Sequence, residues 1–231
     1  MAICAICADS PTVRSHVIPR ALFHDSKRQG RTLIMGGVEP GHRVAQSGKW
    51  TSRILCAEHE RQLGTCDDYG VAFCRAWRRS GRAGDAVVPN QRPALLVDFA
   101  VACIWRMAAA VSDGRPGRIM GVNADLIEGR LFGPGEGCEP AVSIEPFELD
   151  DGRGQPLVFG LLPSPVLPDR RSWHFIVSGL RFLADFDSSA AGSVNALSQV
   201  PLRVSRLRRM DEIAGLPSAL ARMTVARKLR R

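Results

Sequence analysis

Two short stretches decide the fold expected for the first part of this chain. They are Cys4-Ala5-Ile6-Cys7 and Cys56-Ala57-Glu58-His59-Glu60. In each stretch, two metal-binding side chains are separated by two residues, a spacing with which one short turn presents both ligands to the same ion. The sequence therefore predicts a structural zinc site with four ligands, Cys4, Cys7, Cys56 and His59. Such a site would supply folding energy to residues 1–60, which have little apolar core of their own.

Other interpretations of these residues stay open. Cys4 and Cys7 could be ordinary thiols near the N-terminus, and His59 could be a surface residue of a helix. A redox role for the C-x-x-C pair is weaker, because no βαβ pattern surrounds it. The other cysteines have no paired spacing and are interpreted as core or half-buried thiols: Cys66, Cys74, Cys103 and Cys138.

Length and charge limit the possible classes of protein. A chain of 231 residues fits one sizeable domain, or a small module joined to a larger one. The formal net charge of +8 suits a polyanionic partner such as nucleic acid, and the basic residues concentrate towards both ends of the chain. The first residues lack the pattern of a signal peptide, and the longest apolar run, 94–111, is interrupted by Asp98 and Arg106. We therefore expect a cytoplasmic protein without a membrane span.

Periodicity predicts an α+β chain. Strand patterns occupy residues 12–18, 50–55, 141–149, 157–162, 174–177 and 180–186. Helix patterns occupy residues 21–27, a stretch from 57 to about 79 that could break at Gly64, and residues 94–112, 123–132 and 205–231. Residues 28–49 are rich in glycine and polar groups and predict a loop or an irregular hairpin.

These elements suggest four parts. A zinc-stapled module spans residues 1–80, and a linker spans 81–93. An α+β domain at 94–204 packs an antiparallel sheet on the hydrophobic helix 94–112, in which Asp98 and Arg106 fall on a narrow polar stripe. A basic helical tail at 205–231 ends the chain.

Several motifs together resemble the HNH endonuclease group. They are Cys4-x-x-Cys7, then Ser15-His16-Val17-Ile18-Pro19-Arg20, then Ile54-Leu55-Cys56-x-x-His59-Glu60. They are most similar to a bacterial branch with S-H-I-I-P-K and L-L-C-x-x-C-E motifs. Two further pieces, Asp67-Asp68-Tyr69 and Ile104-Trp105-Arg106, resemble motifs of the same branch. The resemblance is sharp over the first eighty or so residues and does not extend to the basic C-terminus.

The resemblance implies a treble-clef ββα-metal fold and a metal-dependent nuclease. His16 would accept a proton from the water that attacks a phosphodiester, a role that suits a neutral imidazole. A divalent ion, Mg²⁺ or Mn²⁺, would stabilise the charge on the phosphate. The chain departs from the pattern with Ser15 before this histidine instead of aspartate, and with Glu60 at the place of the last histidine. Glu60, with Asp67 or Asp68, is then the expected oxygen ligand of that ion.

The main functional prediction is an endonuclease that hydrolyses DNA, in restriction or phage defence. Its expected nucleic-acid contacts are Arg20, Lys49, Arg53, Arg206, Arg208 and Arg209. The C-terminal arginines among them, Arg206, Arg208 and Arg209, could instead lie on a helix face exposed to solvent. The alternative is a non-catalytic zinc protein that binds nucleic acid or a partner protein, in which His16 is structural. The C-terminal domain is the expected surface for such a protein partner.

Overall fold

The parts of the chain that can be described lie mainly in its first four-fifths. The structure, a computed structural model, describes residues 2–27, 32–36, 43–44, 51–79, 92–133, 140–147, 149–150, 156–165 and 172–186. Several predictions fall outside these residues: most of the linker, the basic tail, and the nucleic-acid contacts Lys49, Arg206, Arg208 and Arg209.

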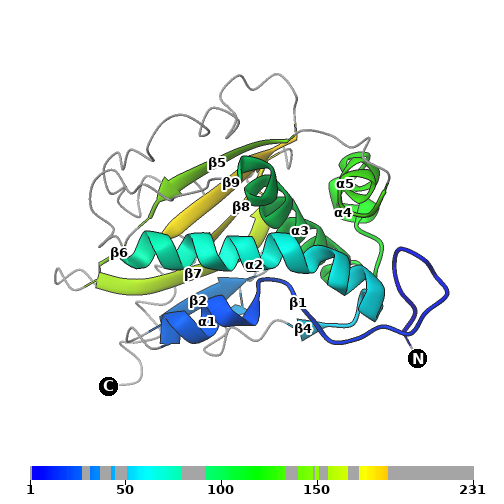
Figure 1. Cartoon of the computed structure of the whole chain (residues 1–231), viewed down its shortest axis with the longest axis horizontal. Helices are drawn as coiled ribbons and strands as arrows, with labels where there is room; N and C mark the ends of the chain where they lie inside the picture. The colour runs from blue at the N-terminus through cyan, green and yellow to red at the C-terminus, as the bar shows by residue number, and fades with distance from the viewer. Residues whose placement is uncertain are drawn as a thin grey trace.

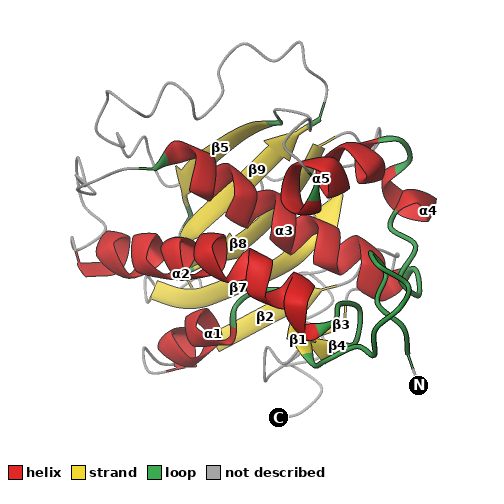
Figure 2. Cartoon of the chain, turned by 45° about the vertical axis from the view of Figure 1, so that its right-hand side comes forward, coloured by secondary structure: helices red, strands yellow, loops and turns green. Residues whose placement is uncertain are grey.

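The observed fold is α+β, as the periodicity predicted, with fourteen described elements. In chain order they are β1 (Ser15–His16), α1 (Arg20–Lys27), β2 (Thr32–Gly36), β3 (Arg43–Val44), β4 (Thr51–Ser52), α2 (Ala57–Arg79), α3 (Pro93–Val111), α4 (Gly117–Met120), α5 (Asn123–Phe132), β5 (Ala141–Pro146), β6 (Leu149–Asp150), β7 (Pro156–Pro165), β8 (Ser172–Val177) and β9 (Leu180–Asp185). Helices α2 and α3 lie side by side across one face of the sheet (Figures 1 and 2).

One sheet combines strands from the N-terminal part of the chain, β2 and β3, with the strands β5 to β9 from its later part. Its strand order is β3-β2-β7-β8-β9-β5, with β6 paired to β7. The neighbours β7–β8, β8–β9 and β9–β5 are antiparallel, but β2 pairs with β7 in parallel, with Thr32 opposite Val158. The prediction of an antiparallel sheet within residues 94–204 is therefore confirmed. The parallel strand β2 lies outside that range, in the stretch expected to be a loop or an irregular hairpin, and adds its backbone hydrogen bonds to β7.

The N-terminal strands are shorter than predicted. Among the described residues of the predicted strands 12–18 and 50–55, Ser15–His16 and Thr51–Ser52 pair, as the antiparallel strands β1 and β4. Elsewhere single backbone bonds join the segments: Val13 N–H donates to the Leu55 carbonyl at 2.9 Å. Pro11 and Pro19 flank the predicted strand 12–18. Proline has no backbone N–H to donate to a neighbouring strand, so the pairing cannot continue past these residues.

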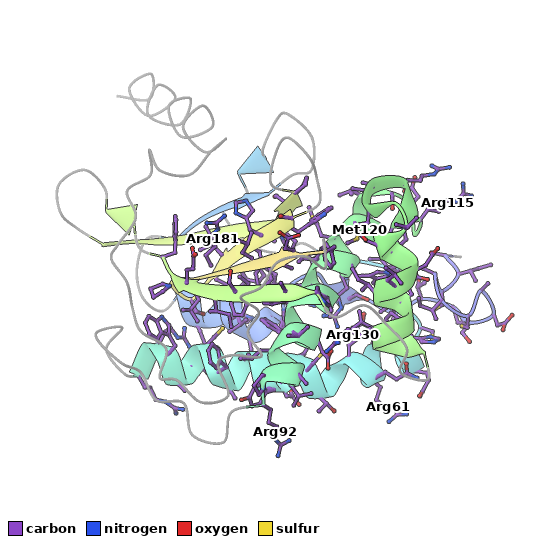
Figure 3. The ribbon with its side chains drawn as sticks, turned by 90° about the horizontal axis from the view of Figure 1, so that it is seen from above. Arg61, Arg92, Arg115, Met120, Arg130 and Arg181 are labelled. Atoms are coloured by element: carbon purple, nitrogen blue, oxygen red, sulfur yellow. The ribbon has the colours of Figure 1, made fainter. Side chains whose placement is uncertain are left out.

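Helix α3 forms the centre of the core. It starts with Pro93 at its first turn, and most of its side chains, from Leu96 to Ala109, are buried. By length and composition it could cross a membrane, with a mean hydropathy of 1.9, but 72% of that window is buried inside the fold. Its polar stripe faces other helices: Arg130 of α5, labelled in Figure 3, donates to Asp98 at 2.7 Å.

Helix α2 runs unbroken through Gly64, contrary to the expected break. A helical glycine costs about 1 kcal/mol, and the buried face of α2, which includes Phe73 and Trp77, outweighs that cost. Gly70 has a different role, because α3 approaches it closely. A Cβ atom on Gly70 would lie 2.4 Å from the ring of Phe99.

Replacing Gly70 by alanine is expected to destabilise the protein by about 1–3 kcal/mol, the usual cost of overpacking a core. The Phe99 ring has little room to yield, since it also packs edge-on against Phe175 and Phe182. Urea unfolding monitored by circular dichroism measures this cost. The matched control is Gly64→Ala, where an added Cβ meets nothing within 4 Å and helix propensity alone predicts stabilisation. An equal change in the free energy of unfolding for Gly70→Ala and Gly64→Ala would contradict the close packing of Phe99 on Gly70.

Candidate metal centre and polar pocket

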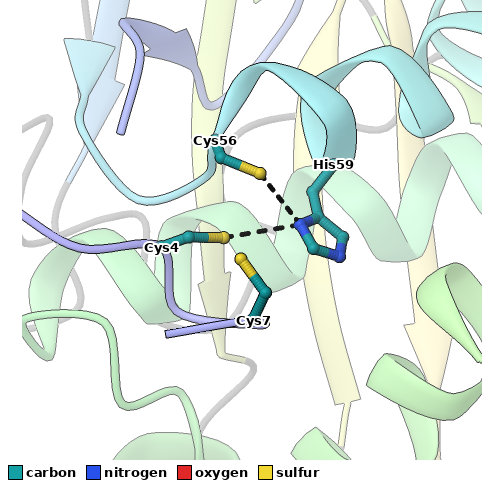
Figure 4. Close-up of side chains that lie close together, drawn as sticks. All are labelled: Cys4, Cys7, Cys56 and His59. Atoms are coloured by element: carbon teal, nitrogen blue, oxygen red, sulfur yellow. Dashed lines mark hydrogen bonds between the residues drawn. The ribbon is translucent and has the colours of Figure 1, made fainter. Parts of the chain in front are cut away.

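The predicted zinc ligands come together in one cluster (Figure 4). A tight turn carries the first pair: the Ala8 N–H donates to the Cys4 carbonyl at 3.0 Å, and Ala8 has a positive φ of 57°. The second pair lies where α2 begins, and the Glu60 N–H donates to the Cys56 carbonyl at 3.0 Å. The Ala5 N–H also donates to the Ile54 carbonyl at 2.8 Å, which fixes the turn against the start of α2.

The geometry of this cluster fits a tetrahedral ion. The four ligand atoms of Cys4, Cys7, Cys56 and His59 lie within 4.8 Å of one another. The Nδ1 atom of His59 is 3.5 Å from the Cys4 Sγ and 3.1 Å from the Cys56 Sγ. Zinc bonds of about 2.3 Å to sulfur and about 2.0–2.1 Å to nitrogen place such atoms roughly 3.5 Å apart. The group can therefore hold a metal ion, and its donor set is compatible with zinc.

Local electrostatics favour ligation at the turn. The backbone N–H of Asp9 holds the pKa of the Cys7 thiol down, at about 7, because it stabilises the thiolate. Burial raises the pKa of Cys4. A thiolate at Cys7 near neutral pH is the form that binds a metal. On the other side of the cluster, the His59 ring packs edge-on against Phe132, with centroids 5.4 Å apart.

A polar pocket of about 400 Å³ lies beside this cluster, along one face of α2. It brings together the three predicted catalytic residues, His16, Glu60 and Asp67, and the predicted contact Arg20. Its other charged lining residues are Asp68, Arg14, Arg75 and Arg106. The acidic residues share the pocket because positions three, four or seven apart fall on one face of a helix.

His16 is half-buried at the pocket wall. Burial lowers its pKa below the ordinary 6.5, and the positive charge of Arg20 lowers it further, whereas Glu60 acts in the opposite direction. The imidazole is therefore neutral at pH 7 and can accept a proton. Next to it, Ser15 is only 1% exposed, and its Oγ has no hydrogen-bond partner among the residues that the structure describes.

Arg106 is the site residue whose role the sequence did not predict. It reaches the pocket from α3, and its guanidinium is 1% exposed. Nη1 and Nη2 donate to the two carboxylate oxygens of Asp67 at 3.0 and 2.8 Å, and Nη2 also lies 3.4 Å from Oε2 of Glu60. A signal was present, because a charged residue inside an apolar helix requires a buried partner.

The remaining predicted contacts are less central. Arg20 is exposed, and its Nε donates to Nε2 of His24 at 2.8 Å. Arg53 is exposed and does not line the pocket. Comparison of the chain with protein-family models, with curated proteins and with solved structures finds no match.

Proposed function

We propose that the protein is an HNH-like endonuclease that hydrolyses phosphodiester bonds in nucleic acid, with DNA as the expected substrate. The observation that supports this proposal is the position of His16: a neutral imidazole in a pocket lined by arginines, beside a Cys/His metal cluster. In this proposal β1, β4 and α2 correspond to a treble-clef ββα-metal module. Zinc bound by the cluster is its structural ion, and it takes no part in the chemistry.

The proposed reaction needs one base and a phosphate site. His16 accepts a proton from water, the water oxygen forms a bond to phosphorus, and the bond to the leaving sugar oxygen breaks. Solvent protonates that oxygen, so the products are a phosphomonoester and an alcohol. The exposed guanidinium groups of Arg14 and Arg20, on the pocket wall, are suited to hold the phosphate oxygens.

The divalent ion implied by the resemblance does not fit the residues of this pocket well. Ser15 replaces the expected aspartate, and both carboxylate oxygens of Asp67 already accept hydrogen bonds from Arg106. Glu60 keeps one buried oxygen, Oε1, without a partner among the described residues. No step of the proposed reaction is therefore assigned to Mg²⁺ or Mn²⁺.

The second candidate function is a zinc protein that binds nucleic acid, or a partner protein, without cutting. The same pairing of Asp67 with Arg106 favours it, because it leaves the pocket short of the ligands that HNH chemistry uses. In that case the pocket would bind phosphate through its arginines alone.

Incubation of the zinc-loaded protein with plasmid DNA, single-stranded DNA and RNA separates these functions. We expect the wild-type protein to cleave plasmid DNA, and the His16→Ala variant to bind the same DNA without cleaving it. Equal cleavage by both proteins would exclude His16 as the base. Binding by both with cleavage by neither would support the non-catalytic function.

A further inference from the structure

Arg106, Glu60 and Asp67 form a charge cluster made from two helices. The Nη2 atom of Arg106 lies 2.8 Å from Asp67 and 3.4 Å from Glu60, so a single nitrogen contacts both carboxylates. The side chains of Glu60 and Asp67 are 21% and 20% exposed, whereas that of Arg106 is 1% exposed. The guanidinium is thus more deeply buried than the two carboxylates, and all three side chains line the pocket.

The position of Nη2 bears on metal binding. A divalent ion shared by Glu60 and Asp67 would need an oxygen from each within about 2.0–2.1 Å. The positively charged Nη2 of Arg106 already lies between Oε2 of Glu60 and Oδ2 of Asp67. An added ion would have to displace this nitrogen or remain close to it, and like charges repel strongly where water is excluded.

The pairing is also persistent. Burial by itself lowers the pKa of Arg106, but Asp67 and then Glu60 raise it, so the guanidinium is charged at every pH of interest. A buried arginine without its carboxylates would be an uncompensated charge, and breaking such a pair is strongly unfavourable. Arg106 therefore stays bound to Asp67 as a fixed part of the core.

We propose that Arg106 is a positioning residue whose guanidinium takes the place of a divalent ion between Glu60 and Asp67, so that the proposed cleavage does not require Mg²⁺. This inference rests on the proposed nuclease function. Arg106 does not contact the substrate, since it is almost completely buried. It holds Glu60 close to His16, compensates the charge of the two acids, and leaves the water and phosphate to His16 and the exposed arginines.

The first test is Mn²⁺ binding by the zinc-loaded protein, followed by electron paramagnetic resonance. We expect no tightly bound Mn²⁺ in the wild-type protein and one bound ion in the Arg106→Gln variant, in which both carboxylates are free. Binding of Mn²⁺ by the wild-type protein that is lost in Glu60→Gln would overturn the inference. This measurement needs no enzymatic activity, so it also decides the inference if the protein does not cleave DNA.

The second test is the Mg²⁺ dependence of plasmid cleavage. The buffers are freed of divalent ions by resin, and the zinc content is measured afterwards to show that the cluster remains loaded. We expect the wild-type rate to be the same with and without added Mg²⁺. Arg106→Gln is expected to be about 10- to 100-fold slower without Mg²⁺, the usual loss when a partner that orients a functional group is removed. Added Mg²⁺ should restore part of this loss.

Two further variants separate positioning from folding. Arg106→Lys keeps the charge and should retain Mg²⁺-independent cleavage better than Arg106→Gln does. Arg130→Gln is the matched control, because it breaks another arginine–aspartate bridge to α3, at Asp98, away from the pocket. It should not change the Mg²⁺ dependence. Wild-type cleavage that occurs only with Mg²⁺ would overturn the inference but leave the nuclease proposal standing, whereas no cleavage under any condition would contradict the nuclease proposal itself.

Discussion

Removal of the metal ion from the cluster of Cys4, Cys7, Cys56 and His59 is expected to unfold the N-terminal part of the protein. Structural zinc contributes about 10–16 kcal/mol of apparent binding free energy in small modules, and a whole domain has a net stability of only about 5–15 kcal/mol. Loss of even a fraction of the zinc-binding free energy could therefore exceed the net stability of the folded N-terminal part. The two-residue strands β1 and β4 offer little stability to replace it.

The measurement combines zinc content with thermal unfolding. We expect one zinc ion per chain in the wild-type protein and none in Cys56→Ser, with a large fall in the unfolding temperature. Chelator should have the same effect on the wild-type protein. Cys66→Ala is the matched control, because Cys66 in α2 is as buried as Cys56, but its thiol donates to the Leu63 carbonyl and does not belong to the cluster. Wild-type protein that contains no zinc when purified without chelator would contradict the metal centre.

The His16→Ala variant is expected to lose about 10²- to 10⁴-fold in cleavage rate, the range typical of a general base. Its affinity for DNA should remain, because Arg14 and Arg20 still line the pocket. His24→Ala is the comparison variant: this histidine is exposed on α1 and does not line the pocket. It accepts a hydrogen bond from Arg20, so its loss can weaken DNA binding, but the cleavage rate at saturating DNA should not change. A similar loss of rate in both variants would argue against a specific role for His16.

The pH profile tests the same assignment without a substitution. Only the neutral imidazole accepts a proton, so the rate should fall when His16 becomes protonated. Burial and Arg20 lower the pKa of His16 below its ordinary 6.5, so the rate should reach half of its maximum at a pH below 6.5. A half-maximal rate at about pH 7 or above, measured on DNA at constant ionic strength, would exclude this histidine as the base.

Local patterns were sufficient for several features. The four candidate metal ligands were found from their spacing, and the structure places their ligand atoms within 4.8 Å of one another. The apolar helix was predicted at 94–112 and observed at Pro93–Val111. The strands at 174–177 and 180–186 were predicted within two residues of their observed bounds. In each case the signal lies within a few consecutive residues, where backbone geometry sets the period.

Other features depend on residues far apart in the chain. Nothing in the composition of residues 28–49 shows that β2 pairs in parallel with β7, because strand pairing is decided by which elements the rest of the fold brings together. In the same way, the sequence showed Arg106 only as part of a polar stripe and at the end of the motif Ile104-Trp105-Arg106. Its partners, Glu60 and Asp67, lie on a different helix, and a buried ion pair forms only when two helices pack.

The sequence by itself indicated the candidate ligands of the metal cluster and the α+β class, which follow from residue types and periodicities at short spacings. The histidine proposed as the base was indicated by the resemblance of its motif to the HNH group. Only the tertiary structure decided how the carboxylates of the pocket are compensated. The close packing of α3 on α2, which Gly70 permits, places a buried guanidinium between Glu60 and Asp67. That contact, made by long-range packing, is what distinguishes this pocket from the metal-binding pocket that the motifs alone imply.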